Sequence, residues 1–187
     1  MLRSKQLLIV IILSFFSATY ALAQSFRASD KSPMDMAYFP DNFAHDRSDG
    51  DKAILRVTYS RPYKKGRNVF GGIVPFDKVS RTGANEVPEI KVYRDIKIGE
   101  QTLKAGVYAL FTIPSKDGWT IIFSSDLDYW GAYSYNKDND VLRAKAVLKS
   151  TNAVIEQFSI QFSEDGKNKG LMYFAWDTTI AELSFSY

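Results

Sequence analysis

Residues 107–124 read VYALFTIPSKDGWTIIFS, and their pattern decides the fold expected for this chain. Alternate positions in the first half are apolar, as in a β-strand that buries one face. Pro114 ends this strand, because a proline cannot donate to a strand ladder. Asp117-Gly118 marks a turn, and the alternation resumes at Trp119. We therefore predict a β-hairpin with a four-residue connection at 115–118.

The same alternation recurs on both sides of the hairpin. It is seen at 55–59, 90–92, 96–98, 142–148, 158–162, 171–176 and 181–187. No amphipathic helix of a dozen residues stands out, although the alanines and lysines of 142–148 also suit a helix. Eight or nine short strands predict a single all-β antiparallel domain, a β-sandwich or jelly-roll-like form. Strand pairing cannot be read from alternation, so a barrel stays open as an alternative.

The first 23 residues are expected to form a cleavable signal peptide. Arg3 and Lys5 give a positive end, and residues 7–16 are an apolar run about half as long as the ~20 residues of a membrane-spanning helix. Ala21-Leu22-Ala23 supplies the small-x-small pattern of a signal peptidase site, which predicts export to the periplasm or the cell exterior. No cysteine follows that site, so we expect no lipid anchor and no membrane anchor after cleavage.

The rest of the chain has the size of one domain. Removing 23 of the 187 residues leaves 164. Residues 24–51 show no sustained period and are predicted to be a partly ordered leader, with the β domain at 52–187. The signal holds two of the 24 basic residues and none of the 21 acidic ones, so the net charge falls from +3 to +1. This charge gives no reason to expect a nucleic-acid partner.

Residues 59–86 follow no regular period and are punctuated by glycine and proline. The polar side chains between these residues are Arg61, Lys65, Arg67, Arg81, Asn85 and Glu86. Guanidinium groups suit carboxylate, phosphate or sulfate, and a neighbouring Asn-Glu pair suits hydroxyl groups. The same residues can equally form a structural knot in which arginines donate to loop carbonyls. Both a binding site and a knot remain open.

Trp130 lies in an aromatic loop with Tyr129, Tyr133 and Tyr135. Such a loop either stacks on a sugar or peptide, or plugs one end of the core. The single histidine, His45, and the absence of cysteine leave too few nitrogen and sulfur ligands for a zinc site. We therefore expect no metal and no cofactor.

Several of these motifs together resemble the DUF2911 family, which is found largely in exported proteins of Bacteroidetes. The resemblance is carried by Tyr59-Ser60-Arg61-Pro62, Lys65-Gly66-Arg67, Phe70-Gly71, Val74-Pro75, Arg81-Thr82-Gly83-Ala84-Asn85-Glu86 and Trp130-Gly131. It extends from about Ser32 to Tyr187. The family name records an unknown function, so the resemblance marks the polar segment as a signature and implies no activity.

The function expected from the sequence is that of an exported binding module. Its ligand would be a small anionic or hydroxyl-rich molecule, such as an envelope glycan or peptide. The residues expected to hold it are Arg61, Lys65, Arg67, Arg81, Asn85, Glu86 and Trp130. One alternative is a hydrolase or lyase with Glu86 as acid or base. The other is a structural envelope protein in which the loop serves only folding.

Overall fold

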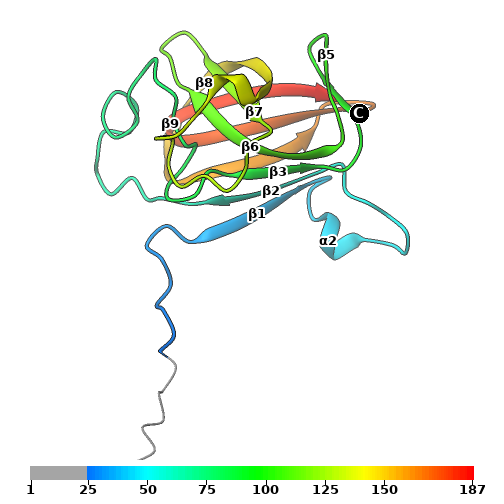
Figure 1. The fold of residues 1–187 in the computed structure, drawn as a ribbon, viewed down its shortest axis with the longest axis horizontal. Helices are drawn as coiled ribbons and strands as arrows, with labels where there is room; N and C mark the ends of the chain where they lie inside the picture. The colour runs from blue at the N-terminus through cyan, green and yellow to red at the C-terminus, as the bar shows by residue number, and fades with distance from the viewer. Residues whose placement is uncertain (1–24) are drawn as a thin grey trace, which may run out of the picture.

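A computed structural model describes residues 25–187, so the predicted signal peptide lies outside the described residues and stays a prediction. Residues 25–187 form one antiparallel sheet of nine strands in the order β1-β2-β3-β6-β7-β8-β9-β4-β5 (Figure 1). The predicted all-β antiparallel domain is thereby confirmed. None of the helices in this part of the chain is long and apolar enough to cross a membrane.

The helical elements are short and lie outside the sheet. They are α2 (Phe43–Asp46) and the 3-10 helix η1 (Lys137–Asn139). The strands are β1 (Met34–Phe39), β2 (Leu55–Ser60), β3 (Glu89–Val92), β4 (Ile96–Ile98), β5 (Gln101–Leu103), β6 (Gly106–Ile113), β7 (Trp119–Ser124), β8 (Asp140–Glu164) and β9 (Lys169–Ser186).

The hairpin predicted from residues 107–124 is present as β6 and β7. The two strands pair from Ala109 with Ser124 to Ile113 with Thr120. β6 ends immediately before Pro114, as a residue without a backbone N–H requires. β7 then pairs with the first part of β8, so residues 142–148 are a strand and not a helix.

The strands β8 and β9 are each longer than predicted. The segments 142–148 and 158–162 belong to the single strand β8, and 171–176 and 181–187 fall in or next to β9. Between Ser150 and Ser159, β8 contains more residues than the facing part of β9. This excess forms a bulge, and bulges bend a strand and increase its twist. The bulge interrupts the alternation, so one strand looks like two in the sequence.

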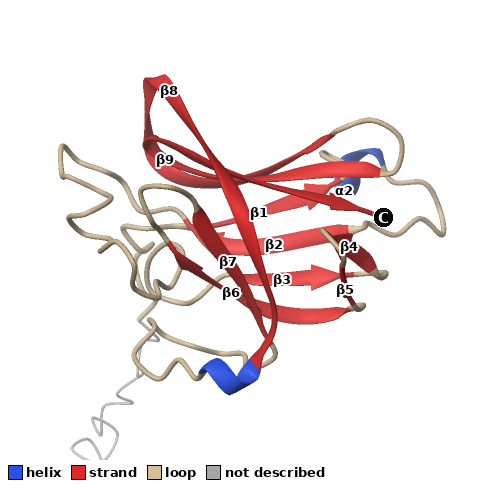
Figure 2. Ribbon diagram, turned by 90° about the horizontal axis from the view of Figure 1, so that it is seen from above, coloured by secondary structure: helices blue, strands red, loops and turns tan. Residues whose placement is uncertain are grey.

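The bend in β8 folds the sheet over its own inner face (Figure 2). The ring of Phe39 on β1 packs against Phe162 on β8 and Phe185 on β9, with ring centroids 6.2 and 5.0 Å apart. The ring of Tyr59 on β2 meets Phe158 on β8 at 6.0 Å. The core therefore lies between two parts of one continuous sheet, packed as the two layers of a sandwich would be.

A second, smaller core covers part of the outer face. Ala109 and Phe111 of β6 and Ile122 of β7 are buried on that side together with Val87. The residues that cover them come from the loops at 79–87 and 127–135. Because β6 and β7 are apolar on both faces here, the chain must lay loops over them.

The sheet begins earlier than the predicted boundary at residue 52. β1 pairs with β2 along its whole length, from Met34 with Ser60 to Phe39 with Leu55. Phe39 is the only side chain of β1 that is fully buried, because β1 is an edge strand. An edge strand with one buried residue leaves little periodicity in the sequence, which explains why residues 24–51 were assigned to a leader.

Candidate functional site

We call residues 59–86, which carry most of the family motifs, the signature segment. The buried hydroxyl of Ser60 joins its first and last motifs. The backbone N–H of Ala84 donates to Oγ of Ser60 at 3.0 Å, and the same hydroxyl donates to the Ala84 carbonyl. Gly83 lies at φ +129°, and a Cβ there would lie 3.1 Å from the Ser60 carbonyl oxygen. A larger residue would crowd this contact. The Tyr59–Pro62 and Arg81–Glu86 motifs thus form one folded unit.

The guanidinium group of Arg61 is used within the fold. Its Nη1 pairs with Asp35 of β1 at 2.8 Å, and Nη2 donates to Oγ of Ser159 at 2.9 Å. Its Nε donates to the carbonyl of Phe158 at 3.3 Å. Arg61 therefore ties the edge strand β1 and the bulge of β8 to the end of β2, as the knot reading expects.

The loop at 62–67 is anchored on the same bulge. The N–H of Lys64 donates to the carbonyl of Glu156 at 2.7 Å, and that of Lys65 donates to the Glu156 carboxylate at 2.8 Å. The ammonium of Lys64 pairs with Asp177 at 3.0 Å, and both side chains are largely buried. Hydrogen bonds from its backbone to Glu156 and an ion pair with Asp177 therefore hold this loop in place.

Arg67 and Lys65 differ in how free their side chains are. Arg67 donates from Nε to the carbonyl of Lys64 at 2.9 Å and from Nη2 to that of Tyr63 at 2.5 Å, so it closes its own loop. The ammonium of Lys65 is exposed and lies 5.8 Å from the centre of the Tyr63 ring. Among the predicted site residues, Arg61 and Arg67 thus hold the loops, whereas Lys65 faces solvent.

The loop at 81–87 is held in an uncommon backbone conformation. Thr82 has φ +57°, which is rare for a β-branched residue, and its buried hydroxyl donates to Oγ1 of Thr112 on β6 at 3.1 Å. Asn85 also has a positive φ, and its amide donates to Asp30 at 3.0 Å. Arg81 is half-buried and reaches the carbonyl of Gly83 at 3.4 Å.

This loop pairs with the aromatic loop, which brings three predicted site residues together. Glu86 forms an antiparallel bridge with Trp130, and the N–H of Gly131 donates to the carbonyl of Asn85 at 2.9 Å. The N–H of Val87 donates to the carbonyl of Tyr129 at 3.0 Å. Glu86 is exposed beside Trp130. Asn85, Glu86 and Trp130 are therefore neighbours, whereas Lys65 and Arg67 belong to the other loop.

The aromatic loop divides into a plug and an exposed pair. Tyr129 and Tyr135 pack edge-on against Phe111, with ring centroids 5.3 and 5.0 Å away. Trp130 and Tyr133 face solvent with 61% and 80% exposure, and their rings lie nearly parallel at 6.1 Å. We call Trp130 and Tyr133 the aromatic platform. The core-plug reading thus applies to Tyr129 and Tyr135, and Trp130 and Tyr133 lie outside the plug.

Gly131 makes the aromatic platform possible. It is buried at φ +76°, and a Cβ there would lie 2.6 Å from a carbon of the Tyr133 ring. The Tyr133 ring therefore rests on bare backbone. The predicted site set omits Tyr133, because its exposure beside Trp130 is seen only in the structure.

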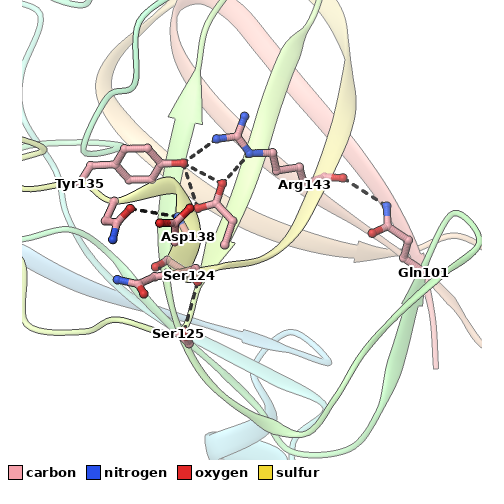
Figure 3. A network of polar contacts seen from close by, with 9 residues as sticks. Gln101, Ser124, Ser125, Tyr135, Asp138 and Arg143 are labelled. Atoms are coloured by element: carbon pink, nitrogen blue, oxygen red, sulfur yellow. Dashed lines mark hydrogen bonds and ion pairs between the residues drawn. The ribbon is translucent and has the colours of Figure 1, made fainter.

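A polar network fixes the base of the aromatic loop on β8 (Figure 3). The hydroxyl of Tyr135 donates to Asp140 at 2.7 Å, and Nε of Arg143 pairs with the same carboxylate at 2.5 Å. Nη2 of Arg143 donates to the Tyr135 hydroxyl at 2.6 Å. Burial, together with the bond to Asp140, raises the pKa of Tyr135 to about 12. The tyrosine thus keeps its proton to a higher pH than an unperturbed tyrosine does.

Asp126, which lies near this loop, has partners inside the protein. Asp126 accepts from the hydroxyl of Tyr129 at 2.5 Å and from the amide of Asn139 at 3.0 Å. Over residues 25–187, no group of three or more histidine and carboxylate residues is arranged to hold a metal ion.

Comparison with known proteins identifies only the family. A family model described as a protein of unknown function, DUF2911, matches residues 41–185. No curated protein and no solved structure matches the chain. The family match confirms the resemblance seen in the signature motifs. It covers the loops and the aromatic platform, and the whole of β1 precedes it.

Proposed function

The chain belongs to the DUF2911 family, whose function is unknown, and we propose that this member is an exported module that binds a glycan on the aromatic platform. The observation that carries the proposal is the exposed, nearly parallel pair of Trp130 and Tyr133. Leaving a large side chain in water forgoes about 1.5–3 kcal/mol that its burial would contribute. A ligand that covers both rings recovers this free energy.

A sugar ring matches the groups around the platform. Its flat C–H face suits stacking on an aromatic ring, and its hydroxyl groups need polar partners at the edge. Glu86 is exposed beside Trp130, and a carboxylate accepts from more than one hydroxyl. Asn85 and Arg81 lie on the same loop, where the Asn85 amide donates to Asp30 and Nε of Arg81 donates to the carbonyl of Gly83. An extended peptide is the alternative ligand for the same surface.

The signature segment has two roles in this proposal. Arg61 and Arg67 are positioning residues, because their guanidinium groups donate to the protein's own carbonyl, carboxylate and hydroxyl oxygens. Glu86, Trp130 and Tyr133 supply the surface that meets the ligand, and Arg81 and Asn85 hold the loop that carries Glu86. Lys65 lies on the neighbouring loop and would contact only a longer chain.

Tryptophan fluorescence tests the proposal directly. The other two tryptophans, Trp119 and Trp176, are 2% and 4% exposed, so external acrylamide quenches mainly Trp130. We expect at least one soluble oligosaccharide from a panel of cell-envelope glycans to protect Trp130 from acrylamide. Trp130→Ala and Tyr133→Ala should each weaken binding at least tenfold by calorimetry. Tyr63→Ala, which removes an exposed ring from the other loop, is the matched control.

The possible results separate the candidate functions. If no oligosaccharide protects Trp130, the glycan proposal is wrong, and protection by peptides alone supports the peptide alternative. Recovery of the bound oligosaccharide intact supports a binding module. Shortened products that disappear in Glu86→Gln would instead support the hydrolase alternative.

Export is part of the same proposal. The aromatic platform would meet envelope glycans only if the chain leaves the cytoplasm, as residues 1–23 predict. Amino-terminal sequencing of the protein recovered from the periplasm or the medium should begin at Gln24. Recovery of the intact chain from the cytoplasm would contradict export.

A further inference from the structure

The outer face of the sheet carries a cleft at a distance from the signature loops. It has a volume of about 580 Å³ and lies between β1, β2, β3 and β6 and the segment at 43–53 that contains α2. Clefts of roughly 300–1,000 Å³ are typical of small-molecule sites. Trp130, Tyr133 and Glu86 do not line it, so the cleft is independent of the aromatic platform.

A row of side chains from four neighbouring strands lines the floor of this cleft. Tyr38, Arg56, Lys91 and Val107 occupy matching register positions on β1, β2, β3 and β6. They alternate with fully buried neighbours such as Leu55 and Ile90, which places them on the outer face. Arg56 and Lys91 are therefore like charges directly opposite one another.

This opposition of Arg56 and Lys91 works against folding. Like charges at facing positions of an antiparallel pair destabilise a sheet. Within residues 25–187, neither side chain has an ion pair or a hydrogen bond, and Nζ of Lys91 lies over the Tyr93 ring, 4.7 Å from its centre. An anion placed between the two cations would relieve their repulsion.

The segment beside the sheet increases the positive charge. Arg47 and Lys52 also line the cleft, and Asp51 is the only carboxylate among its lining residues. The Asp51 carboxylate accepts from the N–H of Ser48 at 3.2 Å, so it already has a partner in its own turn. Four cations thus face the cleft against one engaged carboxylate.

We propose that this cleft binds a small organic anion that carries a ring. A phosphate or carboxylate group would lie between Arg56 and Lys91, where a guanidinium fork and an ammonium supply charge-assisted donors. The ring would pack on the aromatic side chains of the lining, Tyr38, Phe43 and Tyr93. Tyr38 and Phe43 already lie 6.2 Å apart, centroid to centroid.

Nuclear magnetic resonance with simple probes tests the site in the mature protein. We expect phenyl phosphate to shift the amide signals of residues around Arg56 and Lys91. Inorganic phosphate, which lacks the ring, and phenyl glucoside, which lacks the charge, should each bind at least tenfold more weakly. Benzoate shows whether a carboxylate replaces the phosphate. Because the contact is electrostatic, 0.5 M salt should weaken binding several-fold.

Variants that replace charged side chains with uncharged glutamine separate an effect on anion binding from an effect on the stability of the fold. Arg56→Gln combined with Lys91→Gln should weaken phenyl phosphate binding at least tenfold, while the melting temperature stays the same or rises, because a repulsion is removed. The control combines Lys97→Gln with Lys116→Gln, two exposed cations outside the cleft. Unchanged binding in the Arg56/Lys91 variant, or equal binding of inorganic phosphate, would overturn the proposal.

Discussion

The hydroxyl of Ser60 satisfies both backbone groups of Ala84, accepting from its N–H at 3.0 Å and donating to its carbonyl. Ser60 is the last residue of β2 and is fully buried, and Ala84 lies in the signature loop 24 residues later. This contact holds the loop that carries Asn85 and Glu86 against the sheet. It therefore links the stability of the fold to the geometry beside the aromatic platform.

Replacing Ser60 with alanine should destabilise the protein. The variant leaves the N–H and carbonyl of the half-buried Ala84 without their partner, and a buried unsatisfied group costs about 1–3 kcal/mol. We expect the free energy of unfolding, measured in urea, to fall by an amount in the lower part of that range, because Ala84 is only half-buried. Ser184→Ala, at an exposed position of β9, should change it by less than about 0.5 kcal/mol. Equal stability of the two variants would show that the Ser60 contact has little energetic weight.

Gly131→Ala should disturb the aromatic platform beyond the cost of its backbone conformation. Gly66 has a similar φ of +68° and no atom within 4 Å of its Cβ position, so Gly66→Ala measures the conformational cost alone, roughly 1–2 kcal/mol. The added methyl at position 131 must also push the Tyr133 ring away. We expect similar losses of unfolding free energy in the two variants, because the exposed Tyr133 ring moves at little cost, and a changed Trp130 emission spectrum in Gly131→Ala only. Identical behaviour of both variants would contradict the contact.

Asp177→Asn should weaken the attachment of the 62–67 loop. The carboxylate of Asp177 pairs with Lys64 at 3.0 Å in a largely buried position, and its loss leaves an ammonium without a counter-charge. Asparagine tolerates the left-handed backbone of residue 177, at φ +57°, so the change acts mainly on the charge. We expect an unfolding free energy about 1–3 kcal/mol lower. The control is Asp95→Asn in the exposed pair with Lys104, where the effect should be smaller.

The stability of the fold should fall at high pH through Tyr135. Its pKa is about 12 in the folded protein and near 10 when unfolded, so the folded state holds its proton more tightly. Stability from this group is complete below pH 10 and is lost as the pH rises toward 12. Absorbance titration at 295 nm should show a late-ionising tyrosine that disappears in Tyr135→Phe. Titration of this group together with the exposed tyrosines would contradict the buried network.

The predictability of the fold varied with how much of each strand is buried on one face. The predicted hairpin of β6 and β7 is confirmed, because its apolar positions alternate in the sequence and Pro114 and Gly118 mark its turn. β1 was missed because only Phe39 is buried, and β8 was divided in two because its bulge breaks the period. Periodicity in the sequence indicates which face of the sheet each side chain points to. It does not indicate which strand lies at the edge of the sheet or where a strand contains a bulge.

The candidate site was only partly accessible from the sequence. The signature motifs indicated the loops that the proposed site uses, and these loops lie within the residues that the family model matches. The sequence does not show which arginines bond to the protein itself. The partners of Arg61 are Asp35 on β1 and Ser159 at the bulge of β8, and both are distant from it in the chain. The basic cleft was missed, because Arg56 and Lys91 read as ordinary outward positions of separate strands until their register brought them face to face.

Local chemistry alone was enough to establish an antiparallel all-β domain, the position of its main hairpin and the family signature. These features follow from alternation, from turn residues and from short motifs, which are properties of neighbouring residues. The curvature of the sheet, the partners of Ser60 and Arg61, the division of the aromatic loop and the charged row on the outer face were decided by tertiary structure. Each depends on strand pairing between distant residues, and pairing is selected by the packing of the whole core.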